Sequence, residues 1–245
     1  MRKVMLIAGG SDLAGSEIDG TEDSTYNRQH SFGNLLAGKL GYEPVNIAQN
    51  GPTNGTIARS VLEWFNKHYD PNKMELFVLV GWSESARVEM PVDWPTPYET
   101  NNPAADWFGD SCRDYLRINM GWPGMHDREK TIIADTQEFI AKYTSYFEVI
   151  SANLVLQLQY FLKMHKVNYL MCNTLHMFTK GNHLDFYVDL IDHKKYYNVY
   201  NNDECFYWKY KNAGYQNPKA KYWHHGEEPH RLYAEELYNF IKNAD

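Results

Sequence analysis

Three short apolar stretches, each followed by a polar loop and a helical pattern, constrain the fold of this chain more than any other feature. The apolar stretches lie at 4–8, 44–51 and 75–82, and each ends at or next to glycine. The segments between them, 31–42 and 54–69, place apolar residues at helical spacing. This alternation is typical of βαβ units around a parallel sheet. Because ligands bind outside the carboxyl ends of such strands, we expect the loops that follow them to share one functional edge.

The rest of the chain continues the pattern with two irregular interruptions. A long helical pattern over about 128–165 precedes a fourth apolar run at 167–173, and an amphipathic helix is expected at 227–243. The proline- and tryptophan-containing segment at about 83–126 is typical of an irregular insertion, and about 174–223 is irregular and rich in aromatic residues. Because no linker or repeat divides these elements, we expect a single domain over all 245 residues.

Charge and composition exclude several classes of protein. The net charge of −7 disfavours a nucleic-acid-binding surface. The apolar run near the N-terminus is too short for a signal peptide, and no stretch reaches membrane length. The three cysteines form no CxxC pair and are expected to be free thiols in a reducing compartment. We therefore expect a cytoplasmic protein that binds neither nucleic acid nor membrane.

The loops at the expected edge carry the groups that acyl transfer requires. That chemistry needs an exposed hydroxyl, donors for the developing oxyanion and a base. Ser11 supplies a hydroxyl directly after the first strand, and the backbone N–H groups of Ser11 and Gly51 are candidate donors. Asn54 or Ser83 would supply a third donor from its side chain. Two structural roles also stay open: Ser11 as an ordinary turn residue, and Asn54 as the N-cap of the following helix.

The candidate bases lie near the C-terminus, in the stretch YWHHGEEPHRLYAEEL. His224, His225 and His230 come just before or at the start of the last expected helix. His230 follows Glu227 in an acid-x-x-His pattern and is an alternative base. On a helix, however, these two residues lie one turn apart, which favours packing against the preceding loop over catalysis. We therefore favour His224.

In these residues the chain resembles the SGNH hydrolases, also called GDSL-type esterases and lipases. The four blocks read, in chain order, Gly9-Gly10-Ser11, Gly51 with Asn54, Gly81-Trp82-Ser83-Glu84 and Lys221-Tyr222-Trp223-His224. Their order and spacing match over essentially the whole chain, most closely to divergent SGNH-like proteins of tailed phages. The resemblance implies a flavodoxin-like α/β fold, with a central parallel sheet flanked by helices on both faces. It also implies Ser11 as nucleophile and His224 as base.

Three positions depart from the family pattern. Gly10 and Ser83 stand where the family has Asp and the oxyanion-binding Asn, and Lys221 stands where it has the acid that orients the histidine. Loss of one oxyanion donor typically costs about 10²–10³ in rate, and loss of the orienting acid about 10⁴. Glu227, Glu228 or a backbone carbonyl would have to replace that acid.

The sequence therefore predicts a serine esterase that uses a Ser11–His224 dyad or an incomplete triad and no cofactor. A short acyl group, such as acetyl on a carbohydrate, is the expected substrate class. No metal is expected, because the spacing of the potential ligands between 172 and 193 matches no compact zinc pattern; these are Cys172, His176, His183, Asp185 and His193. The alternative function is a non-catalytic SGNH-like module that binds a glycan or a protein, as a phage structural or accessory protein would. The aromatic residues of 174–223 fit a lid, a sugar or partner platform, or ordinary packing.

Overall fold

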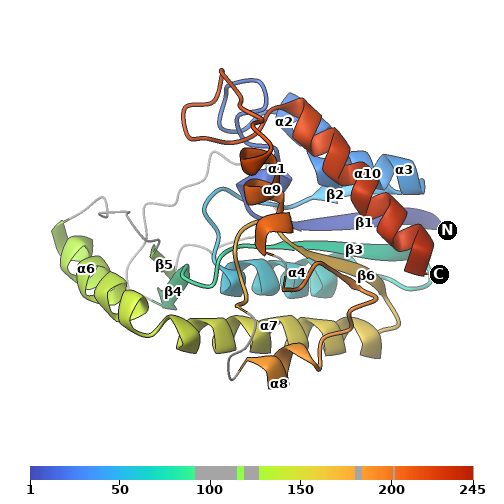
Figure 1. The fold of residues 1–245 in the computed structure, drawn as a ribbon. Coiled ribbons are helices and arrows are strands. Elements are labelled where there is room, and N and C mark those ends of the chain that lie inside the picture. The colour runs from blue at the N-terminus through green and yellow to red at the C-terminus, as the bar shows by residue number, and fades with distance from the viewer. Residues whose placement is uncertain (92–114, 119–126, 180–183, 201, 245) are drawn as a thin grey trace.

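The structure is a computed structural model that describes residues 1–91, 115–118, 127–179, 184–200 and 202–244. Within these residues a five-stranded parallel sheet has the order β2-β1-β3-β6-β7 (Figure 1). The strands are β1 (Arg2–Gly9), β2 (Glu43–Asn46), β3 (Met74–Trp82), β6 (Asn168–Asn173) and β7 (Tyr196–Tyr197). The central strands β1, β3 and β6 end at the same edge, where Gly9 pairs with Gly81 and Gly81 with Cys172.

Helices cover both faces of the sheet (Figure 1). One face carries α3 (Phe32–Leu40) and α10 (Glu227–Ala244), and the other carries α4 (Asn54–His68) and α7 (Thr144–Met164). The shorter helices are α1 (Ser11–Ala14), α2 (Thr25–His30), α8 (Asp185–Val188), α9 (Phe206–Asn212) and the 3₁₀ turn Asn202–Glu204. Helix α6 (Asp127–Lys142) precedes α7, and β4 (Val88–Pro91) pairs antiparallel with β5 (Tyr115–Ile118).

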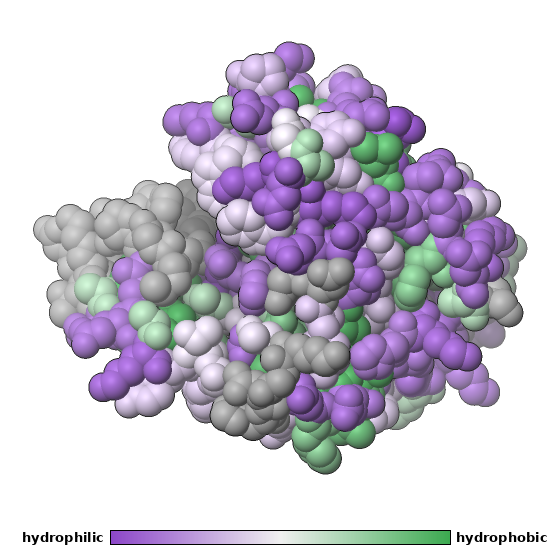
Figure 2. Space-filling model, viewed as in Figure 1, coloured by the Kyte–Doolittle hydropathy of each residue, from purple (hydrophilic) through white to green (hydrophobic). Residues whose placement is uncertain are grey.

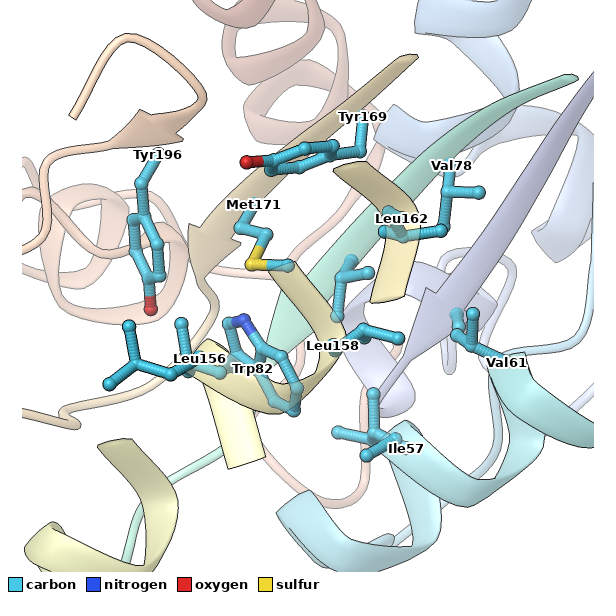
Figure 3. Close-up of a cluster of buried hydrophobic side chains, with 14 of the residues drawn as sticks. Ile57, Val61, Val78, Trp82, Leu156, Leu158, Leu162, Tyr169, Met171 and Tyr196 are labelled. Atoms are coloured by element: carbon cyan, nitrogen blue, oxygen red, sulfur yellow. The ribbon is translucent and has the colours of Figure 1, made fainter. Parts of the chain in front are cut away.

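The sheet lies between two apolar cores because its central strands are buried on both faces. Figure 3 shows the core on the α4 and α7 side, where Trp82 and Met171 of the sheet face Ile57 of α4 and Leu158 of α7. On the face of the molecule shown in Figure 2, hydrophilic residues dominate and hydrophobic ones form separate patches. No helix of the described residues is both long enough and apolar enough to span a membrane.

The expected α/β fold with a central parallel sheet and helices on both faces is confirmed, with differences in detail. The helical pattern at 128–165 divides into α6 and α7 at Tyr143, whose backbone leaves the helical region at ψ 42°. Thr53, not Asn54, caps α4, because its side chain accepts the N–H of Thr56. The segment 174–223, expected to be irregular, contains the short helices α8 and α9 and the two-residue strand β7. Of the predicted insertion at 83–126, residues 92–114 and 119–126 lie outside the described residues.

The close approach of β1 and β3 leads to a stability prediction. A Cβ at Gly9 would lie 2.5 Å from Leu13 Cδ1 and 2.7 Å from the Gly81 carbonyl oxygen. Gly9→Ala should therefore lower the free energy of unfolding by about 1–3 kcal/mol, the usual cost of overpacking. Gly38→Ala is the control, because a Cβ on that exposed residue of α3 meets nothing within 4 Å. Gly38→Ala should raise the free energy of unfolding by up to about 1 kcal/mol. Urea unfolding measures both changes, and an equal change in the two variants would contradict this account.

Candidate functional site

Ser11 lies directly after β1, at the carboxyl edge of the sheet. The chain turns directly after β1, and the N–H groups of Leu13 and Ala14 both donate to the Gly10 carbonyl at 3.0 Å. Ser11 is half-buried, and its Oγ forms no hydrogen bond with any described residue. Backbone groups therefore close this turn, and the hydroxyl is not needed for it.

Glu17 follows six residues later and binds the loop that carries His224. Its side chain is 1% exposed, and its backbone has a left-handed φ of 62°. The carboxylate accepts the N–H of Lys221 at 2.8 Å and that of Tyr222 at 3.0 Å. Its Oε2 also lies 2.6 Å from Nδ1 of His224. One buried acid therefore organises the segment from Lys221 to His224.

The protonation of this pair follows from its contacts. Burial acts to raise the pKa of Glu17, but the hydrogen bonds from His224 and from the N–H groups of Lys221 and Tyr222 outweigh it and hold that pKa below its ordinary value. An ionised carboxylate only accepts hydrogen bonds, so the proton of a neutral His224 lies on Nδ1. Its Nε2 then carries the lone pair, and no described residue hydrogen-bonds to it. This is the tautomer that a general base needs.

Ser11 and His224 lie on neighbouring loops and are not hydrogen-bonded to each other among the described residues. The two loops meet through Glu17, which follows Ser11 by six residues and contacts His224 Nδ1. Burial raises the pKa of Asp12, the residue directly after Ser11. Catalytic hydrogen bonds are often long in unliganded enzymes and shorten when substrate binds.

The two side-chain candidates for the oxyanion site have different surroundings. Asn54 Oδ1 accepts the N–H of Ser83 at 2.9 Å, and its Nδ2 donates to the Ser83 carbonyl at 3.2 Å and to Ser151 Oγ at 3.1 Å. The Asn54 amide is thus occupied in holding the loop after β3. Ser83 Oγ is buried and has no hydrogen-bond partner among the described residues. Gly51 is half-buried with a left-handed φ of 61°.

The structure does not support the alternative base. His230 is 1% exposed, and its Nδ1 accepts the N–H of Phe32 at 3.2 Å. Burial lowers the pKa of His230 to about 3, so the ring is a neutral member of the core between Phe32 and Phe206. His225 is also buried, with Nε2 3.0 Å from the Tyr207 carbonyl. Of the three histidines, His224 alone combines partial exposure with a ring nitrogen that bonds to no residue of the described part of the chain.

A pocket of about 420 Å³ lies beside this site. Residues of the loops after β3 and β6, of α9 and of the segment before His224 line it. Trp223 connects the pocket with the candidate base, because its ring stacks almost parallel to that of His224 at a centroid distance of 6.0 Å. Ser11 is not part of the pocket lining, so the pocket adjoins the candidate catalytic groups and does not contain them.

The residues weighed for a metal site do not come together in the part of the chain that the structure describes. No group of three or more His, Cys, Asp or Glu residues is placed there to hold an ion. Cys172 lies in the core, where burial raises the pKa of its thiol to about 12. His183 lies outside the described residues.

Comparison with solved structures shows the fold of this chain, and comparison with family models shows its family. A carbohydrate esterase family 2 enzyme with a carbohydrate-binding domain, from Corynascus thermopiles (Myceliophthora fergusii), matches 99% of this chain and 66% of its own, with a TM-score of 0.52 and 13% identity. An acetyl xylan esterase from Butyrivibrio proteoclasticus matches 99% of this chain and 64% of its own, with a TM-score of 0.47 and 12% identity. The chain thus spans about two thirds of the length of these structures. At 13% identity the first of them shows the fold alone.

The comparison with curated proteins found no match. None of the comparisons bears on the likeness to phage proteins, which stays an expectation. The parallel α/β fold that the resemblance to SGNH hydrolases implies is confirmed by the topology of the sheet and by the structural neighbour with a TM-score of 0.52. A family model described as a family of unknown function (DUF6071) matches residues 13–244, so the chain belongs to that family.

Proposed function

We propose that the protein is a serine esterase in which Ser11 is the nucleophile, His224 the general base and Glu17 the acid that orients the base. The observation that carries the proposal is the 2.6 Å contact between the buried Glu17 carboxylate and His224 Nδ1, which leaves Nε2 unoccupied. A buried acid, a histidine and an unused serine hydroxyl on adjoining loops are the parts of a catalytic triad.

The proposed reaction follows the usual order of acyl transfer. His224 Nε2 takes the proton of Ser11 Oγ as that oxygen attacks the acyl carbon of the ester. The N–H groups of Ser11 and Gly51 and the hydroxyl of Ser83 donate to the oxyanion. His224 then gives its proton to the departing alcohol. In the second half, water loses a proton to His224 and attacks the acyl carbon of the acyl-enzyme. The bond from that carbon to Ser11 Oγ then breaks, the carboxylic acid leaves, and His224 returns its proton to Ser11 Oγ.

In this proposal Glu17 orients His224 and so replaces the acid that the family pattern has at position 221. Lys221 contributes its backbone N–H to the Glu17 carboxylate, so the position serves the site through its main chain. The two acids considered as replacements have other partners: Glu227 accepts a hydrogen bond from Tyr26, and Glu228 pairs with Arg231 at 2.6 Å. The orienting acid in this proposal therefore comes from the opposite end of the chain.

The proposed substrate is an ester of a carbohydrate with a short acyl group such as acetyl. The structural neighbour with the higher TM-score of the two described above is a carbohydrate esterase, which supports this substrate class. The aromatic pocket beside His224 gives independent support, because aromatic rings bind the apolar faces of sugars. We propose the cytoplasm as the compartment and a single domain as the organisation, as the sequence predicts.

A fluorophosphonate probe tests whether Ser11 is an activated nucleophile. Intact-mass measurement should show one added phosphonyl group on the wild type, and Ser11→Ala should abolish it. The control is Ser145→Ala, which changes a half-buried serine of α7 and should leave labelling intact. An unlabelled wild type, or continued labelling of Ser11→Ala, would exclude the proposed mechanism and favour the non-catalytic binding module.

Substitution of Glu17 tests the orienting acid. Glu17→Gln keeps an oxygen that can accept the N–H of Lys221, but it removes the charge that stabilises a protonated His224. We expect kcat on an aryl acetate to fall by up to about 10⁴, the loss seen when a triad loses its acid, with KM nearly unchanged.

The control for this change is Glu22→Gln, because Glu22 is an exposed acid a few residues further along the same loop. Near-ultraviolet circular dichroism should show that both variants are folded. A folded Glu17→Gln protein with wild-type kcat, or a loss confined to KM, would show that Glu17 does not act through His224.

A further inference from the structure

The pocket beside His224 combines aromatic side chains with cationic side chains that can donate hydrogen bonds. Its aromatic wall consists of Tyr207, Trp208 and Trp223, of which Trp208 is 37% exposed and Trp223 62% exposed. Its charged groups are Arg87 and Lys211, with Glu84 as the one carboxylate. This combination is not explained by the proposed catalytic groups, none of which lines the pocket.

Trp223 is held in the pocket at a conformational cost. Its φ of 65° lies in the left-handed region, which costs a residue with a side chain roughly 1–2 kcal/mol. The Glu17 carboxylate binds its neighbours on both sides, through the N–H of Tyr222 and through His224. Such strain collects at functional sites and persists only when the surroundings enforce it. An exposed ring fixed in this way is a contact surface and not a part of the core.

Lys211 and Arg87 supply positive charge to the pocket, and among the described residues only Arg87 has an ion-pair partner, Glu84. Lys211 Nζ lies 4.4 Å from the centre of the Trp208 ring and 5.1 Å from that of Tyr207, and it forms no ion pair with a described residue. Arg87 is mostly buried and gives its Nε to Glu84 at 2.9 Å. The two terminal nitrogens of Arg87 have no partner in the described part of the chain.

The charge of the pocket is therefore opposite to that of the whole molecule. Glu84 offsets the charge of Arg87, and Lys211 leaves a net positive charge, while the chain as a whole carries −7. His176, also in the lining, adds no charge near neutral pH, because burial lowers its pKa. Guanidinium and ammonium donors next to a stacking surface fit a ring that carries a carboxylate.

We propose that this pocket binds an anionic carbohydrate, a sugar ring with a carboxylate, as the alcohol part of the ester. The inference rests on the proposed esterase function and names its substrate class. In the proposed complex the sugar ring stacks on Trp208 and Trp223. The carboxylate accepts hydrogen bonds from Lys211 and from the terminal nitrogens of Arg87. The acylated hydroxyl lies on the His224 side of the Trp223 ring. A uronic acid residue of a glycan has this chemistry.

Binding to the Ser11→Ala variant tests the pocket without turnover. The probes are trisaccharides of galacturonate, glucuronate and mannuronate, each compared by calorimetry with its fully methyl-esterified, neutral form. We expect at least one acid to bind about tenfold or more tightly than its ester, as one charge-assisted hydrogen bond implies. Lys211→Gln should remove that preference, and Trp208→Ala should weaken acid and ester alike. Lys67→Gln, on the exposed end of α4, is the control and should change neither.

Three results would overturn the inference: equal affinity for acids and esters, tighter binding of the esters, or no binding of any probe. Equal or tighter binding of the esters would identify a neutral-sugar pocket. This test is independent of the test of the proposed function. The fluorophosphonate probe contains no sugar, and the calorimetry is done on the Ser11→Ala variant, which lacks the proposed nucleophile. Labelling of Ser11 without uronate binding would leave the esterase proposal standing and remove only this one.

Discussion

The Glu17 carboxylate is the interaction on which the geometry of the site depends. It joins two loops separated by about 200 residues of sequence, one directly after the Ser11 turn and one directly before α10. The Glu17 carbonyl adds a second link, because it accepts the side-chain amide of Asn217 at 2.6 Å. These hydrogen bonds offset the cost of burying an acid and of its left-handed backbone. Glu17 thereby holds the loop after the Ser11 turn against the loop of His224, and its contacts with Tyr222 and His224 fix the backbone on both sides of Trp223.

The parallel sheet supplies the frame for this interaction. Its central strands end together, so the loops after β1, β3 and β6 meet at one edge although they are far apart in the chain. The glycines at these ends allow close packing, since Gly9 and Gly81 both lie against Leu13 of the Ser11 turn. Asn54 and Ser83 then join the loop after β3 to the start of α4. The site is thus built on the rigid ends of the sheet.

The pattern of apolar residues predicted two kinds of element: strands that are continuous apolar runs, and long helices with one apolar side. The runs at 4–8 and 75–82 are buried on both faces, and the helices at 54–69 and 227–243 have a clear apolar side. It did not predict β7, because two residues are too few to form a pattern. It also did not show the break at Tyr143, since apolar spacing continues across a change in backbone direction.

Only the candidate residues that lie in short sequence motifs could be predicted. The order of the four motifs predicted Ser11 and His224. No motif includes Glu17, because its contacts are with residues that lie close to it only in the folded chain. The same limit explains His230: its acid-x-x-His spacing is local, whereas its burial against Phe32 and Phe206 is not. The absence of an acid at position 221 suggested an incomplete triad from sequence, and in the proposed mechanism Glu17 provides the acid from another part of the chain.

The tautomer of His224 tests the central claim of this account most directly. Long-range proton–nitrogen NMR of ring-labelled protein at about pH 9, where an ordinary histidine is neutral, distinguishes the two ring nitrogens. An acceptor-only Glu17 requires a protonated Nδ1 with a downfield proton signal and a bare Nε2. A His224 ring protonated on Nε2, or one that exchanges freely between the two forms, would contradict the proposed role of Glu17 and the mechanism that depends on it.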